Sequence, residues 1–132
     1  MSGPAHGIDE RLERSRRNLR RLYPAEVPAR LDAGAVLVDI RPVAQRVVHG
    51  EVAGAVVIDR NVLEWRLDPT SVSALPWASH DLEVIVMCQQ GYSSSLAAET
   101  LQELGIAAAT DMVGGFESWL ASGLPVVASS DT

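Results

Sequence analysis

The sequence has 132 residues, with one cysteine, no lysine and few aromatic residues. A single cysteine excludes an internal disulfide and a cysteine-rich zinc site. The three histidines, His6, His49 and His80, lack the spacing of metal ligands, so we expect neither a metal nor another cofactor. No apolar run is long enough to span a membrane, and residues 1–9 lack the basic-then-apolar order of a signal peptide. We therefore expect a cytoplasmic protein, in a compartment where thiols stay reduced.

Positive charge is confined to the first half of the chain. All eleven basic residues are arginines, and the last of them is Arg66. Phosphate contacts need cations, so we expect no nucleic acid to bind the acidic second half. Residues 8–22 form an Arg-rich helix candidate with an apolar stripe. One interpretation is that this helix docks on the domain through that stripe. The other is that it offers a basic surface to an acidic partner or an anionic membrane, which its three acidic residues make less favourable.

The remaining chain alternates short apolar strands with helices. The pattern predicts strands at residues 35–40, 54–58, 84–87 and, more weakly, 107–112, and a short helix at 24–31 that Pro28 interrupts. This alternation predicts an α/β fold with a central, mostly parallel sheet and helices on both faces. The length predicts one domain at residues 24–127, with an Arg-rich helical extension at 1–23 and a loose tail at 128–132.

Cys88 ends the clearest predicted strand and opens a tight loop before a helix that Gly105 should terminate. Backbone N–H groups and the helix dipole favour an anion at such a position, so the thiol should ionise readily, and the thiolate is the nucleophile. A lone cysteine after an apolar strand is more often a small buried hydrophobe. Gly91 and the three serines that follow Tyr92 nevertheless suit an anion cradle.

Four segments, in order, resemble motifs of the rhodanese-like sulfurtransferases, especially the single-domain bacterial type. They are the Asp-x-Arg strand end at 38–41, the Gly-x-x-x-Gly-Ala segment at 50–55, the six-residue loop at 88–93, and the Gly-Gly-aromatic-x-x-Trp pattern at 114–119 followed by Gly-x-Pro-Val at 123–126. The similarity spans about residues 24–127. Glu51 and Ala53 replace the usual His and Pro, and the loop at 88–93 has no arginine or lysine.

The resemblance implies a rhodanese fold and a sulfurtransferase that carries sulfur as a persulfide on Cys88, the catalytic residue. The donor would be a small sulfane-sulfur compound such as thiosulfate, and the acceptor cyanide or a thiol. The loop residues that would bind the substrate are Gln89, Gln90, Gly91, Tyr92 and Ser93. Arg46 would be the cation that binds the donor. Asp39 and Arg41 should form a structural ion pair, given how readily arginine binds carboxylate.

Two other functions compete with this interpretation. The first is a sulfur carrier or protein-binding module, in which Cys88 exchanges sulfur with a protein partner and turns over few small donors. The second is a phosphatase or arsenate reductase, which would need an arginine six places after the cysteine. Ser94 stands there instead, which disfavours this chemistry.

Overall fold

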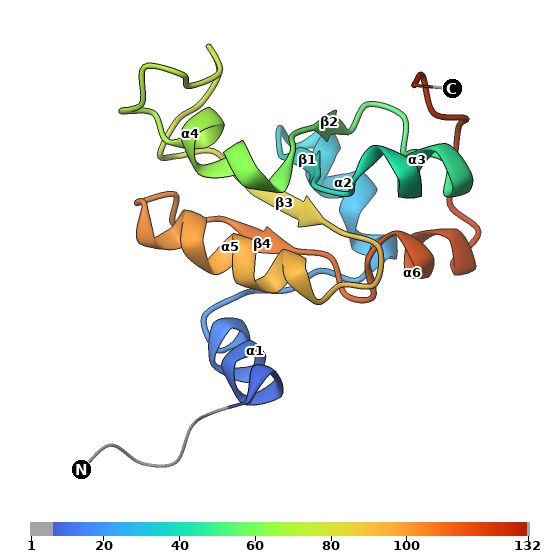
Figure 1. The fold of residues 1–132 in the computed structure, drawn as a ribbon, viewed down its shortest axis with the longest axis horizontal. Coiled ribbons are helices and arrows are strands. Elements are labelled where there is room, and N and C mark those ends of the chain that lie inside the picture. The colour runs from blue at the N-terminus through green and yellow to red at the C-terminus, as the bar shows by residue number, and fades with distance from the viewer. Residues whose placement is uncertain (1–6, 132) are drawn as a thin grey trace.

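The structure, a computed structural model, describes residues 7–131; His6 and the ends of the expected extension and tail lie outside this range. Its centre is a four-stranded, all-parallel sheet in the order β2-β1-β3-β4 (Figure 1). The strands are β1 (Val36–Asp39), β2 (Val56–Val57), β3 (Val84–Met87) and β4 (Thr110–Asp111). The β3 strand has the bounds predicted from the sequence, because its four consecutive apolar residues are buried on both faces.

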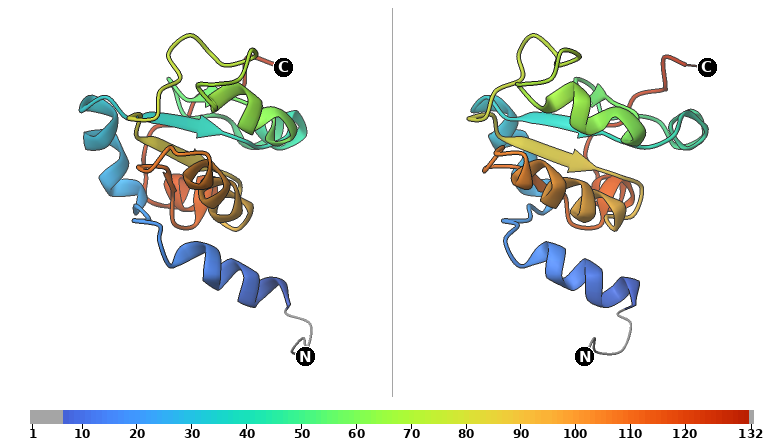
Figure 2. Two further views of the ribbon diagram at one scale, coloured as in Figure 1. Left: turned by 90° about the vertical axis from the view of Figure 1, so that its left-hand side faces the viewer. Right: turned by 60° about the vertical axis from the view of Figure 1, so that its left-hand side comes forward.

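Helices cover both faces of the sheet, as predicted (Figure 2). The α-helices are α1 (Ile8–Arg16), α2 (Val27–Asp32), α3 (Val43–His49), α4 (Leu63–Leu67), α5 (Ser93–Glu103) and α6 (Gly115–Ala121), with 3-10 turns η1 (Pro24–Glu26) and η2 (Arg60–Val62). One apolar cluster joins Leu63 and Leu67 of α4 and Leu101 of α5 to the sheet. A second cluster on the other face joins Val27 of α2 to Phe116 of α6. The predicted α/β class, with a parallel sheet and helices on both faces, is therefore confirmed.

The first helix ends six residues earlier than the sequence pattern predicts. Beyond Arg16 the chain extends toward the sheet, where Leu22 forms a parallel bridge with Met112. The Leu22 N–H donates to the Asp111 carbonyl at 3.0 Å, and the Leu22 carbonyl accepts from Val113 at 2.8 Å. These contacts outweigh the local preference for helix. The segment therefore runs along the edge of β4 instead of finishing a helix.

The C-terminal segment is held against the domain rather than loose. Val127 forms an antiparallel bridge with Glu51. Ser129 is buried, and its hydroxyl donates to the Glu51 carboxylate at 2.7 Å. Asp131 forms an ion pair with Arg46. The expectation of a loose tail is therefore wrong for the described residues up to 131, because the carboxylate of Glu51 and the charge of Arg46 give this segment polar partners.

Candidate active site

The strand order places a crevice between β1 and β3. From β1 the chain moves outward to β2, whereas from β3 it moves the other way to β4, and ligands bind at such a reversal in open α/β sheets. A pocket of about 240 Å³ lies there, beyond the carboxyl ends of both strands. Its lining residues are Ile40, Arg41, Pro42, Gln45, Cys88, Gln89, Gln90, Tyr92 and Ser93. A larger hollow of about 480 Å³, at the opposite ends of the strands, has no thiol in its lining.

Cys88 lies at the base of this pocket with 6% of its surface exposed. Two backbone N–H groups point at its sulfur: Gly91 N lies 3.1 Å and Ser94 N lies 3.4 Å from Sγ. The second of these belongs to the first turn of α5, so the helix N-terminus faces the sulfur as expected. Donors aimed at one sulfur favour its negatively charged form over the neutral thiol. The cradle predicted from the loop sequence is therefore present.

The glycine pair at the start of α6, with Gly114 as N-cap and Gly115 as first residue, lies against the Cys88 loop. The N–H groups of Phe116 and Glu117 donate to the carbonyls of Cys88 and Gln89, at 2.9 and 3.0 Å. This close approach requires glycine at position 115, where φ is +61° and a Cβ would lie 2.4 Å from the Cys88 carbonyl oxygen. The glycine at position 115 therefore lets the start of α6 hold the backbone of Cys88 and Gln89 in place. In the same helix Trp119 packs into the core, and its indole N–H donates to the Pro125 carbonyl at 2.8 Å.

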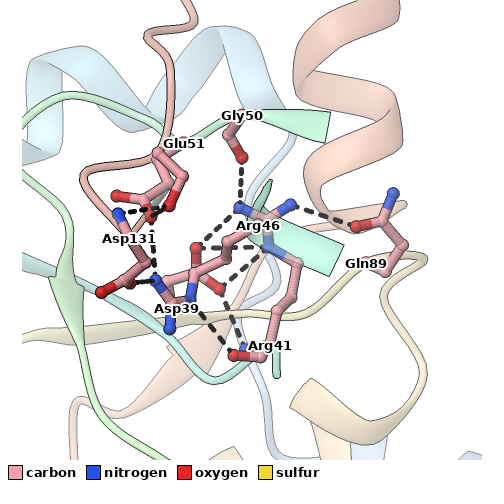
Figure 3. A network of polar contacts seen from close by, with 8 residues as sticks. Asp39, Arg41, Arg46, Gly50, Glu51, Gln89 and Asp131 are labelled. Atoms are coloured by element: carbon pink, nitrogen blue, oxygen red, sulfur yellow. Dashed lines mark hydrogen bonds and ion pairs between the residues drawn. The ribbon is translucent and has the colours of Figure 1, made fainter. Parts of the chain in front are cut away.

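Asp39 and Arg41 form the ion pair that the sequence predicts. Both side chains are fully buried, and the shortest distance between their charged groups is 2.8 Å (Figure 3). The same guanidinium donates to the Gly50 carbonyl at 2.8 Å and to Gln89 Oε1 at 3.1 Å, and it lies 4.0 Å from the centre of the Phe116 ring. Arg41 thus ties the end of β1 to the Cys88 loop. Its structural role extends into the site itself.

Arg46 does not line the pocket, which corrects its assignment as the cation that binds the donor. Its buried guanidinium donates to Glu51 at 2.9 Å and forms an ion pair with Asp131 (Figure 3). The pKa of Arg46 is raised, chiefly by its hydrogen bond to Asp131. The pKa of Glu51 is lowered, first by the hydrogen bond from Ser129 and also by Arg46. Glu51, one of the two departures from the motif at 50–55, thus binds both Arg46 and the C-terminal segment.

Behind the loop lies a polar cluster that sequence reasoning missed. The carboxylate of Asp111 is fully buried and accepts hydrogen bonds from the hydroxyls of Ser94 and Ser95, both at 2.7 Å. Arg21 binds the same carboxylate through two nitrogens, at 2.8 and 3.2 Å. One available signal was Asp111, the single charged residue in the stretch 106–113. Another was the run of three serines, two of which donate to the Asp111 carboxylate.

The remaining pocket residues form the rim. Gln90 and Ser93 line the pocket, and Tyr92 is 60% exposed at the crown of the loop. Trp65 and Trp77, which could have walled the site, lie outside the pocket lining. Within residues 7–131 no group of histidine, cysteine or acidic side chains could hold a metal ion, and no helix has the length and apolar character to cross a membrane.

Comparison with known proteins places the chain in a family. The model of the rhodanese-like domain family matches residues 23–122. A thiosulfate sulfurtransferase, GlpE of Stutzerimonas stutzeri, is 33% identical over 102 residues, which are 77% of this chain and 85% of that protein. The adenylyltransferase and sulfurtransferase MOCS3 of rice, Oryza sativa subsp. japonica, is 33% identical over 96 residues, 67% of this chain but only 21% of that protein. The chain belongs to the rhodanese-like domain family.

Solved structures agree with this placement. A Rhodopseudomonas palustris protein of unknown function, described as a possible tyrosine phosphatase, has a TM-score of 0.84 at 29% identity, and the alignment covers 96% of this chain and 98% of that one. The polysulfide-sulfur transferase of Wolinella succinogenes, solved as a homodimer, has a TM-score of 0.72 at 25% identity and covers 93% and 88% of the two chains.

Proposed function

We propose that this protein is a cytoplasmic sulfurtransferase that carries a sulfane sulfur as a persulfide on Cys88. The observation that carries the proposal is the pair of backbone N–H groups aimed at the Cys88 sulfur at the base of a small pocket. A cavity of about 240 Å³ suits a small inorganic donor better than a large organic one. Thiosulfate is our first candidate, in keeping with the name of the S. stutzeri relative, a thiosulfate sulfurtransferase.

In the first step the Cys88 thiolate attacks the outer sulfur of the donor. A bond forms between the two sulfurs, and the bond to the donor's remainder breaks with its electron pair on the leaving group, which is sulfite when the donor is thiosulfate. The persulfide keeps one negative charge, now centred on the terminal sulfur. The N–H groups that converge on Cys88 stabilise this charge, as oxyanion-hole donors do in acyl transfer.

In the second step a nucleophile attacks the terminal sulfur. Cyanide would leave as thiocyanate, and a thiolate would leave as a persulfide of its own. The electron pair of the broken sulfur–sulfur bond returns to Cys88, which regenerates the thiolate. Because the first product departs before the acceptor reacts, steady-state kinetics should follow a ping-pong pattern.

A sulfur carrier that serves a protein acceptor is the second candidate. The rice relative MOCS3 is both an adenylyltransferase and a sulfurtransferase, and the similarity to this chain covers only 21% of that longer protein. The Cys88 loop itself has no cationic side chain to attract a dianionic donor. A carrier would show stable persulfide loading but slow turnover with small donors.

Phosphatase chemistry, which has been suggested for the R. palustris neighbour, has less support here. The residue six places after Cys88 is Ser94, whose side chain is buried and bound to Asp111. It therefore offers no cation to a phosphoryl group. We expect no Cys88-dependent hydrolysis of an aryl phosphate above background, and clear hydrolysis would reverse this ranking.

The test is a thiocyanate assay with cyanide as acceptor and a panel of sulfane donors that includes thiosulfate and polysulfide. The wild type should turn over at least one donor. Cys88→Ser, which is nearly isosteric, should fold normally and lose this turnover. Turnover retained in Cys88→Ser would refute the proposal, and stable persulfide loading without turnover would favour the carrier.

A further inference from the structure

Two arginines from outside the family's domain reach the Cys88 loop. The family match begins at residue 23, whereas Arg16 ends α1 and Arg21 lies in the extended segment that follows. Both guanidiniums donate to the Gly91 carbonyl, Arg16 at 2.8 Å and Arg21 at 3.1 Å. Arg16 also donates to the Ser95 hydroxyl at 3.0 Å. The N-terminal extension therefore contacts the catalytic loop directly.

The two guanidiniums bring two positive charges together, which is unfavourable unless nearby negative charge offsets the repulsion. The pKa of Arg16 is lowered by burial and by the neighbouring Arg21, whereas Asp111, Tyr92 and Cys88 act to raise it. Asp111 compensates one of the two charges through its paired contacts with Arg21. The guanidinium of Arg16 donates to neutral oxygens, those of Gly91 and Ser95, so it adds positive charge beside a loop whose own sequence contains no cation.

The bound carbonyl also fixes the orientation of a peptide group. Its peptide bond joins Gly91 to Tyr92 and is trans, because the described chain has no cis peptide. In a trans peptide the C=O and N–H groups point in opposite directions. While the arginines hold the Gly91 carbonyl, the Tyr92 N–H must point away from them. The two arginines thus fix the peptide that follows Gly91, whose own N–H donates to the Cys88 sulfur at 3.1 Å.

We propose that Arg16 and Arg21 are positioning residues of the active site, through which the N-terminal extension supplies the positive charge and the loop orientation that residues 88–93 cannot supply alone. Arg16 does not contact the substrate. It acts on the sulfur by orienting the Gly91–Tyr92 peptide and through the electrostatic field of its guanidinium. The inference deepens the proposed function, because it concerns the same cysteine and its anionic forms.

The experiment compares Arg16→Gln with Arg16→Lys and with Arg17→Gln in the full-length protein. Glutamine removes the charge of Arg16, and lysine keeps it. Arg17 is the adjacent residue, is exposed, and gives a matched loss of one charge at the end of α1. Cys88 is the one thiol in the chain, so its alkylation can be followed without interference. Circular dichroism and thermal melting would verify that each variant is folded.

The decisive readout is the ratio of the alkylation rate with iodoacetate to that with iodoacetamide. The two reagents differ in charge but react with the same thiolate. A merely structural disturbance changes both rates together, whereas loss of a nearby cation slows the anionic reagent more. We expect this ratio to fall about three- to tenfold in Arg16→Gln and to stay within about twofold of the wild type in Arg16→Lys and Arg17→Gln.

Sulfur transfer provides the second readout. Arg16→Gln should lower kcat/KM about tenfold, mainly through kcat, because the persulfide charge develops after the donor is bound. An unchanged alkylation ratio in Arg16→Gln, or an equal fall in Arg17→Gln, would overturn the inference. The predicted ratios would support it even if no donor were turned over, a result that would refute only the proposed function.

Discussion

Replacing Gly115 with alanine should destabilise the protein and displace the catalytic loop. At φ +61° an alanine carries the strain of the left-handed region, about 1–2 kcal/mol. Its Cβ would also lie 2.4 Å from the Cys88 carbonyl oxygen and 2.7 Å from the Gly91 nitrogen. Both are backbone atoms of the loop, so relieving the clash requires moving the loop, at a further cost of about 1–3 kcal/mol. We expect a total loss of about 2–5 kcal/mol in unfolding free energy.

Gly123→Ala is the matched control. Its φ is +76°, but no atom lies within 4 Å of the Cβ position, so the substitution introduces strain without a clash. Urea unfolding should show a loss of only about 1–2 kcal/mol for this variant. Its kcat/KM for sulfur transfer should be unchanged, whereas Gly115→Ala should lose most activity even under conditions where it is folded. Equal destabilisation of the two variants, together with full activity in Gly115→Ala, would refute the role assigned to the Gly-Gly pair.

Two further predictions concern charge. Gln90→Lys adds a cation to the pocket rim and should lower the KM for thiosulfate by a few-fold to about tenfold. This effect should shrink as the salt concentration rises. An unchanged KM would mean that the pocket does not respond to the charge of the donor. The lowered pKa of Glu51 predicts a stabilising contribution that is full above its unfolded value near 4.5 and is lost as pH falls through the lower folded value. Glu51→Gln should therefore be less stable than the wild type by about 1–2 kcal/mol at pH 7. Urea unfolding at several pH values should show that this difference disappears in acid. A difference that is independent of pH would contradict the prediction.

Local sequence patterns were enough to predict the centre of the fold and the backbone N–H groups that face Cys88. The β3 strand and the helix after Cys88 follow from an apolar run, a glycine turn and a serine-rich helix start, all within twenty residues. The Asp39–Arg41 pair was equally accessible, because its members are two residues apart on one strand end. Each of these features is determined by neighbours along the chain.

The surroundings of the site depend on contacts between distant residues, which one sequence does not reveal. Arg21 meets Asp111 across 90 positions, and Arg46 meets Asp131 across 85. The helical pattern of residues 8–22 also gave no sign that the helix ends at Arg16. The interaction that competes with helix there is a bridge between Leu22 and the distant Met112. An arginine can bind any carboxylate within reach, so the sequence left open which of the eleven arginines would serve the loop.

The most direct test of the central claim is the mass of the intact protein after incubation with thiosulfate or polysulfide and removal of the excess donor. Because the chain has one cysteine, a persulfide on Cys88 would appear as a gain of a single sulfur atom. Our account predicts this gain in the wild type, its loss when cyanide is added with formation of thiocyanate, and its absence from Cys88→Ser. A wild-type protein whose mass does not change with any sulfane donor, or a Cys88→Ser variant that still acquires the sulfur, would contradict it.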